Sequence, residues 1–116
     1  MNKSLLGTQS EEAAARFLRS RGYRLLQRNY RTRFAEIDII ARDGDTLCFV
    51  EVRSKNTPGF EPAESIDLRK RRKIGRAAVQ YLKEHDLLDH RARFDVVCVR
   101  DGQGQLIKDA FDLEED

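Results

Sequence analysis

Three carboxylates stand among the apolar residues of the stretch AEIDIIARDGDTLCFVEVRSK, residues 35–55. Glu36, Asp38 and Glu51 fall within two strand-like runs, although carboxylates are poor strand formers and costly to bury. Arg53 follows Glu51 after one residue. Carboxylate oxygens are the ligands that hard cations such as Mg2+ and Mn2+ prefer, and a cationic side chain can offset the charge of a phosphate. These residue types therefore suit metal-dependent phosphodiester chemistry.

A two-residue turn at 43–44 predicts that the stretch is a β-hairpin. In that register Asp38 faces Phe49. Glu36 faces Glu51, and Asp38 and Glu51 become diagonal neighbours with Cα atoms roughly 7 Å apart. Because side chains alternate between the two faces, the carboxylates gather on one face that we expect not to be used for core, where Mg2+ or Mn2+ could hold them. Salt bridges on an exposed sheet face are the alternative. The opposite face is almost wholly apolar and is expected to be core: Ile37, Ile39, Ala41, Thr46, Cys48, Val50 and Val52.

The rest of the chain is expected to supply two helices and more strands. A helix is predicted over 10–21, with Thr8 and Glu11 as its capping box, and a second over 67–85. Strands are predicted over 23–31, 93–100 and 105–111, and 56–62, which holds both prolines, is a loop. The order indicates an α/β fold with a mixed central sheet flanked by helices. Length predicts one domain over 1–116, with its core at about 7–100 and an acidic tail at about 112–116. The buried stripe of the second helix is expected to be Ile74, Ala77, Ala78, Tyr81 and Leu82.

Basic residues cluster in 19–33 and 68–76, although the net charge of the chain is only +2. Such blocks attract a phosphate backbone, and a solvated basic surface is an equally good interpretation. In the second helix Arg69, Arg72, Lys73 and Arg76 share one side. The candidate nucleic-acid-binding residues are Arg31, Arg33, Lys55, Lys70 and Lys73.

The sequence argues against a zinc site and a disulfide framework. Cys48 and Cys98 have no CxxC partner, and His85 and His90 lie in polar context. Both thiols are expected to be core residues in a reducing compartment. Because no apolar run is long enough for a signal peptide or a membrane span, we expect a cytoplasmic protein without a membrane partner.

The spacing of Asp38 and Glu51-Val52-Arg53 resembles the PD-(D/E)xK signature of nucleases with a restriction-endonuclease-like αβββαβ core. The segments EEAAARFLRSRGYRLLQRNYR, AEIDIIARDGDTLCFVEVRSK, the basic helix and RFDVV resemble the YraN family of small bacterial proteins over about residues 7–100. That family is related to archaeal Holliday junction resolvases, which cut branched DNA as homodimers. The resemblance implies DNA as partner, a homodimer as one possible state, and Mg2+ or Mn2+ on Asp38 and Glu51. It implies catalytic roles for Glu11, Asp38, Glu51 and Arg53.

Glu11 has two interpretations. Besides capping, it can point inward with Ala14, Ala15 and Leu18, whereas Glu12 points toward Arg16 and solvent.

Two residues depart from the pattern: Ala35 stands where the family usually has Gly, and Arg53 replaces the signature lysine. Arginine stays protonated, so it can offset phosphate charge but cannot act as a general base. Two hypotheses follow. The chain is a metal-dependent nuclease that hydrolyses DNA, branched DNA included, or it is a catalytically weak or inactive nucleic-acid-binding module in DNA repair or recombination. A third, a protein-binding scaffold, would show no salt-sensitive DNA affinity.

Overall fold

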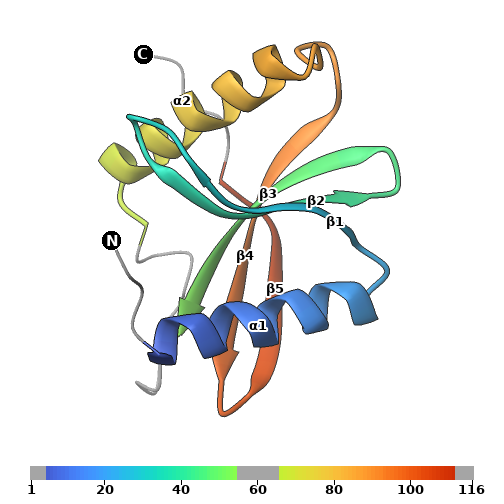
Figure 1. Cartoon of the computed structure of the whole chain (residues 1–116), viewed down its shortest axis with the longest axis vertical. Coiled ribbons are helices and arrows are strands. Elements are labelled where there is room, and N and C mark those ends of the chain that lie inside the picture. Colours follow the sequence, from blue (N-terminus) through green and yellow to red (C-terminus); the bar gives the residue numbers. More distant parts are fainter. Residues whose placement is uncertain (1–4, 55–65, 112–116) are drawn as a thin grey trace.

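Five strands form one twisted sheet with a helix on each side of it, as Figure 1 shows for the computed structural model. The structure describes residues 5–54 and 66–111. Strands lie in the order β1-β2-β3-β4-β5, with β3 and β4 parallel and the other neighbours antiparallel. The predicted α/β class with a mixed sheet is confirmed, and the arrangement is compatible with a restriction-endonuclease-like αβββαβ core followed by one more strand. The elements are α1 (Leu5–Ser20), β1 (Arg24–Arg31), β2 (Glu36–Asp43), β3 (Thr46–Ser54), α2 (Leu68–Glu84), β4 (Ala92–Arg100) and β5 (Gln103–Phe111).

Helix α1 covers one face of the sheet with Ala14, Ala15 and Leu18, which are fully buried. It begins at Leu5 rather than Ser10, so Thr8 lies inside the helix and the predicted capping box is wrong. The helix extends further because residues 5–9 contain no proline to stop it. It ends at the expected glycine: Gly22 has φ +88°, and its N–H donates to the carbonyl of Arg19 at 3.0 Å.

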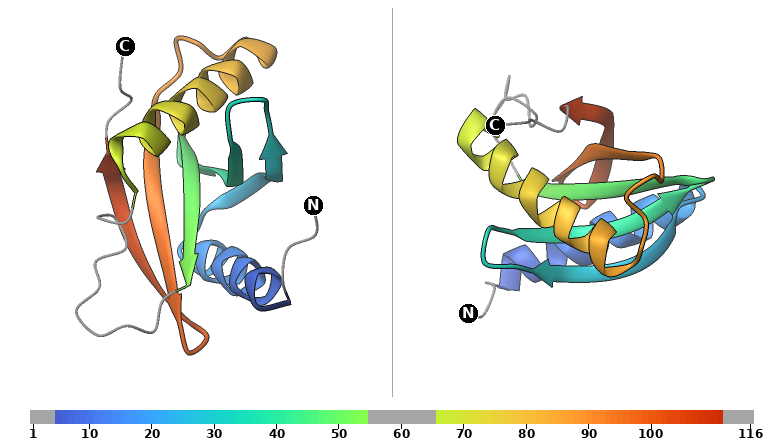
Figure 2. Two further views of the ribbon diagram at one scale, coloured as in Figure 1. Left: turned by 90° about the vertical axis from the view of Figure 1, so that its left-hand side faces the viewer. Right: turned by 90° about the horizontal axis from the view of Figure 1, so that it is seen from above.

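Helix α2 covers the other face and crosses the sheet in both views of Figure 2. Asp67 caps it, since the Asp67 carboxylate accepts from the N–H of Lys70 at 2.8 Å. The predicted stripe of Ile74, Ala77, Ala78, Tyr81 and Leu82 is buried, as expected. This stripe packs on residues of the sheet that include Tyr30, Ile40, Leu47, Phe49, Phe94 and Val96.

The β2–β3 hairpin has a different register from the predicted one. Asp43 pairs with Thr46, so the turn is at 44–45 and Ile40, not Asp38, faces Phe49. Gly44 takes φ +63° at the first turn position, where glycine is favoured over a residue with a side chain. The register moved by two residues, which is the period of a strand, so most of the predicted division into faces survives.

The expectation that one hairpin face would stay out of the core is wrong. Ile40, Leu47 and Phe49 share that face with the carboxylates and are buried under α2. The opposite face is core as expected, with Ile39, Ala41, Cys48 and Val50 under α1. Both faces are apolar near the turn because a helix covers each of them. The carboxylates Asp38 and Glu51 lie farther along the strands, where the pairing of β2 and β3 stops.

Cys48 and Cys98 are both buried free thiols, as predicted. Among the described residues, no helix is long and apolar enough to cross a bilayer.

Candidate functional site

A cleft opens where β2 and β3 part. Their paired residues run from Asp43 and Thr46 to Ile39 and Val50. Beyond that point the carboxylate of Asp38 accepts a hydrogen bond from the backbone N–H of Val52 at 2.8 Å. The Asp38 side chain thus accepts the hydrogen bond that a backbone carbonyl of β2 would otherwise accept, and the backbone pairing of β2 with β3 ends here. The cleft has a volume of about 630 Å³ and is lined by Ala35, Glu36, Asp38, Glu51, Asp67, Arg69, Lys70 and Lys73.

Three carboxylates from two elements meet beside this cleft. Glu11, Glu36 and Asp38 each offer a carboxylate oxygen, and these three oxygens lie within 4.8 Å of one another. Glu11 comes from the middle of α1 and is only 6% exposed. Glu12 points away and pairs with Arg28 at 2.6 Å. Of the two interpretations of Glu11, the inward-facing one describes its position.

Glu51 is the buried carboxylate of the cleft, at 8% exposure. The Lys70 ammonium lies 2.8 Å from Glu51 Oε2, and the Arg53 guanidinium lies 3.6 Å from the same oxygen. Burial raises the pKa of Glu51, the nearby Asp38 charge raises it further, and the two cations oppose this without reversing it. The cost of burying the Glu51 charge therefore outweighs the attraction of the two cations.

The helix side of the cleft is basic. Arg69, Lys70 and Lys73 come from the first two turns of α2, where the helix dipole also favours an anion. Sequence reasoning placed Lys70 and Lys73 among the nucleic-acid-binding candidates but did not predict that Lys70 would contact Glu51. The contact depends on how α2 crosses the sheet, and that is a tertiary property.

The other predicted binding residues lie around this cleft or outside the described part of the chain. Arg31, at the end of β1, pairs with Glu36 at 3.5 Å. Arg33 lies in the turn between β1 and β2, with its guanidinium 5.0 Å from the centre of the Phe34 ring. Lys55, the predicted loop 56–62 and the acidic tail 112–116 fall outside the described residues.

A buried polar network at the other end of the sheet was missed by the sequence analysis. Asp95 is fully buried and accepts hydrogen bonds from Tyr23 at 3.1 Å and Arg93 at 2.9 Å. Arg93 also donates to Asp43 at 2.8 Å. Asp43 is five strand residues from Asp38, or about 16 Å at the usual rise, so the network is separate from the cleft. Its sequence signal was an aspartate inside the apolar run RFDVVCVR.

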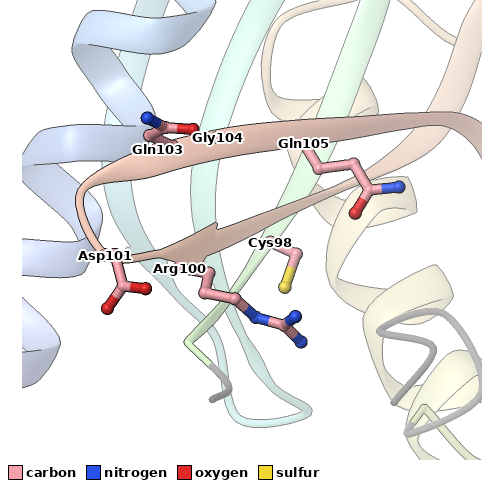
Figure 3. A pocket seen from close by; sticks show the side chains of 6 residues that line it. All are labelled: Cys98, Arg100, Asp101, Gln103, Gly104 and Gln105. Atoms are coloured by element: carbon pink, nitrogen blue, oxygen red, sulfur yellow. The ribbon is translucent and has the colours of Figure 1, made fainter. Parts of the chain in front are cut away.

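A second hollow, of about 330 Å³, lies at the β4–β5 hairpin. Figure 3 shows its lining residues Cys98, Arg100, Asp101, Gln103, Gly104 and Gln105. Asp101 is the acidic residue among them, so this hollow has no group of carboxylates comparable to the cleft. We therefore place the candidate site in the cleft.

Comparison with known proteins gives one consistent family. A family model described as "Uncharacterised protein family UPF0102" matches residues 10–99, a range that includes every residue of the cleft. A UPF0102 protein of Persephonella marina is 47% identical over 109 residues, which cover 93% of this chain and 94% of that protein. A UPF0102 protein of Desulfosudis oleivorans is 52% identical over 109 residues, covering 91% of this chain and 89% of that protein. A UPF0102 protein of Geobacter sulfurreducens is 41% identical over 99 residues, covering 84% and 77%.

Proposed function

The chain belongs to the UPF0102 family, the family of YraN, and from its cleft we propose that it is a metal-dependent nuclease that hydrolyses phosphodiester bonds in DNA. One observation carries the proposal: carboxylates of β2 and β3 line a cleft whose opposite wall is the basic start of α2, and Glu11 of α1 joins the β2 carboxylates beside it. A metal ion suits the acidic wall, and a phosphate suits the basic one.

The donor set fits Mg2+ or Mn2+. All candidate ligands are carboxylate oxygens, which these hard cations prefer. Oxygens bound to one Mg2+ lie about 2.1 Å from it and therefore at most about 4.2 Å apart. The oxygens of Glu11, Glu36 and Asp38 lie within 4.8 Å of one another, so rotation of these side chains could bring them onto one ion. A bound ion would supply an activated water and offset charge on the phosphate. This group shares Asp38 with the sequence-based ligand set of Asp38 and Glu51 and adds Glu11 and Glu36, whereas Glu51 is not part of it and contacts Lys70 and Arg53 instead.

Lys70 is well placed for the role of the signature lysine that Arg53 replaces. Its ammonium lies closer to Glu51 than the Arg53 guanidinium does, 2.8 Å against 3.6 Å. From α2, Lys70 can orient the attacking water and offset the charge of the phosphate, while Arg53 holds the Glu51 carboxylate in place. Arg69 and Lys73 would bind phosphate oxygens at the mouth of the cleft.

A binding module without hydrolysis, acting in DNA repair or recombination, is the second candidate. The observation that favours it is the pairing of Glu51 with two cations of the chain itself. Such pairing can replace a metal ion as the neutralising charge. In this case DNA would still bind to the basic wall, and the acidic residues would serve only to position α2.

Calorimetric titration with Mn2+ and Mg2+, followed by cleavage assays on branched, duplex and single-stranded DNA, tests the proposal. The variants are Asp38→Asn and Glu11→Gln, which keep the shape of each side chain. The matched control is Glu12→Gln, the neighbouring acid on α1 that points to Arg28. We expect metal binding and cleavage to be lost in the first two variants and kept in the control. Metal binding without cleavage would favour the binding module, and no metal binding by the wild type would refute the metal site.

A further inference from the structure

We propose that the DNA strand leaving the cleft runs along α2 and places an unpaired base on Phe34. The inference rests on the proposed function for the position of the reacting phosphate. It adds a substrate class, which is DNA with a single-stranded segment next to the site of hydrolysis.

Three hollows connect along α2. The cleft shares Arg69 and Lys73 with a groove of about 490 Å³. All four residues that line this groove are basic: Arg69, Arg72, Lys73 and Arg76. The groove shares Arg76 with a third hollow, of about 380 Å³, beside Phe34. The three hollows are therefore adjacent along α2, and every residue that two of them share is a cation.

The length of this series of hollows suits a short run of nucleotides. Arg69, Lys73 and Arg76 are spaced i, i+4 and i+7 and so follow one side of the helix. Seven residues span about 10 Å of helix axis. The basic row is therefore long enough to contact more than one phosphate of a single strand.

Phe34 is held firmly at the end of the row. It lies in the turn between β1 and β2, and Figure 1 shows this turn beside α2. The hydroxyl of Thr32 accepts from the N–H of Phe34 at 3.0 Å and from the N–H of Ala35 at 3.1 Å, which fixes the turn. The ring is partly exposed, with the guanidinium of Arg33 at 5.0 Å and that of Arg76 at 5.9 Å from its centre.

An aromatic ring flanked by cations at the end of a basic groove is the combination that binds single strands. The cations follow the backbone, and the ring stacks on a base. A base inside a duplex already stacks on its neighbours and cannot reach the ring, so the arrangement selects unpaired bases. The third hollow offers space beside the ring and is lined also by Val79, Gln80, Lys83 and Glu84. The Glu84 carboxylate accepts hydrogen bonds from the Tyr30 hydroxyl at 2.6 Å and the Gln80 amide at 3.3 Å.

The test measures binding in EDTA, so that hydrolysis and metal binding play no part. A fluorescent single-stranded oligonucleotide and the blunt duplex of the same sequence are titrated with wild-type protein, Phe34→Leu and Phe34→Tyr. We expect Phe34→Leu to weaken single-strand binding roughly 5- to 100-fold, the range for loss of one stacked base, and to leave duplex binding unchanged. Phe34→Tyr, which keeps a ring, should bind as the wild type does. Leu26→Ala, which trims an exposed apolar side chain on β1, is the control and should change nothing.

A second measurement follows the basic row. Arg76→Gln should weaken binding of the single strand and reduce the slope of log K against log salt by about 0.7, the value for one phosphate contact on a single strand. Wild-type affinity in Phe34→Leu, or equal losses for single strand and duplex, would overturn the inference and leave the ring as a packing residue under two arginines. Ring-dependent single-strand binding without metal-dependent cleavage would keep the inference and refute the nuclease. Cleavage without ring dependence would do the reverse.

Discussion

Replacing Glu51 by glutamine should stabilise the metal-free protein at neutral and higher pH. Glu51 is 8% exposed, and an ionised carboxylate at such a site costs several kcal/mol of desolvation. The two opposing cations are partly exposed, Lys70 at 42% and Arg53 at 21% of their side chains. Ion pairs with partly exposed cations stabilise the folded state by only about 0.5–1 kcal/mol each. Glutamine removes the buried charge and keeps the shape, so we expect a gain of about 1–2 kcal/mol in the free energy of unfolding.

The pH dependence follows from the direction of the pKa shift. In the folded protein the pKa of Glu51 lies above its ordinary value of 4.5, chiefly because of burial. Stability associated with this group is therefore fully present below pH 4.5 and is lost as pH rises through the folded pKa. Glutamine does not titrate. The advantage of Glu51→Gln over the wild type should accordingly be near zero at pH 4 and reach its full size above the folded pKa.

Chemical denaturation from pH 4 to pH 8 in EDTA measures this difference. Glu12→Gln is the matched control, and its effect on stability should have the opposite sign. Arg28 lowers the pKa of Glu12 and stabilises its ionised carboxylate. That variant should be slightly less stable than the wild type at pH 8, and its deficit should shrink toward low pH. A wild type more stable than Glu51→Gln at pH 8 would show that the cations over-compensate the burial of Glu51. A difference independent of pH would show that the charge of Glu51 is not its cause.

Three further predictions concern the scaffold. Asp95→Asn removes the charge at the centre of the buried network and should lower the free energy of unfolding by about 3 kcal/mol in a denaturant titration. Tyr23→Phe deletes one hydrogen-bond donor and should lower it by about 1 kcal/mol. Equal losses in the two variants would contradict this role of Asp95. Asp67→Ala removes the cap of α2 and should cost about 1 kcal/mol, with Asp67→Ser recovering most of it. Gly104→Ala would bring a Cβ to 2.6 Å from the Phe17 ring, so the protein should unfold at a temperature several degrees lower. Adding Phe17→Leu should restore the wild-type unfolding temperature. An unchanged unfolding temperature in Gly104→Ala alone would mean that the ring moves freely.

Much of the fold could be predicted because the helices and strands follow from the local spacing of apolar residues. The stripe from Ile74 to Leu82 marked the buried side of α2, and alternation in the hairpin placed Glu51 and Arg53 together on one face. The start of α1 was wrong because Thr8 and Glu11 match a capping box by chance, and a local match cannot reveal that the helix already began at Leu5.

The candidate site was predicted only in part. Asp38 and Glu51 were found because carboxylates interrupt apolar strands, and they stay on one face because a register shift of two residues leaves the faces unchanged. Glu36 was not among the predicted ligands Asp38 and Glu51, yet it joins Glu11 and Asp38 in one group of oxygens. That grouping requires α1 to cross the sheet next to the point where β2 leaves β3, which no spacing along the chain specifies.

By itself, the sequence determined which residues are apolar at which period, and therefore the helices, the strands and the sheet faces that must be covered. It also determined that acidic residues interrupt two strands and that basic residues follow one side of a helix. Only the tertiary structure decided that Lys70 contacts Glu51, that Glu11 reaches Asp38, and that Phe34 ends the basic row of α2. Local patterns report interactions over a few residues, whereas these contacts join residues 19 to 42 positions apart, and their geometry is set by how two helices pack on one twisted sheet.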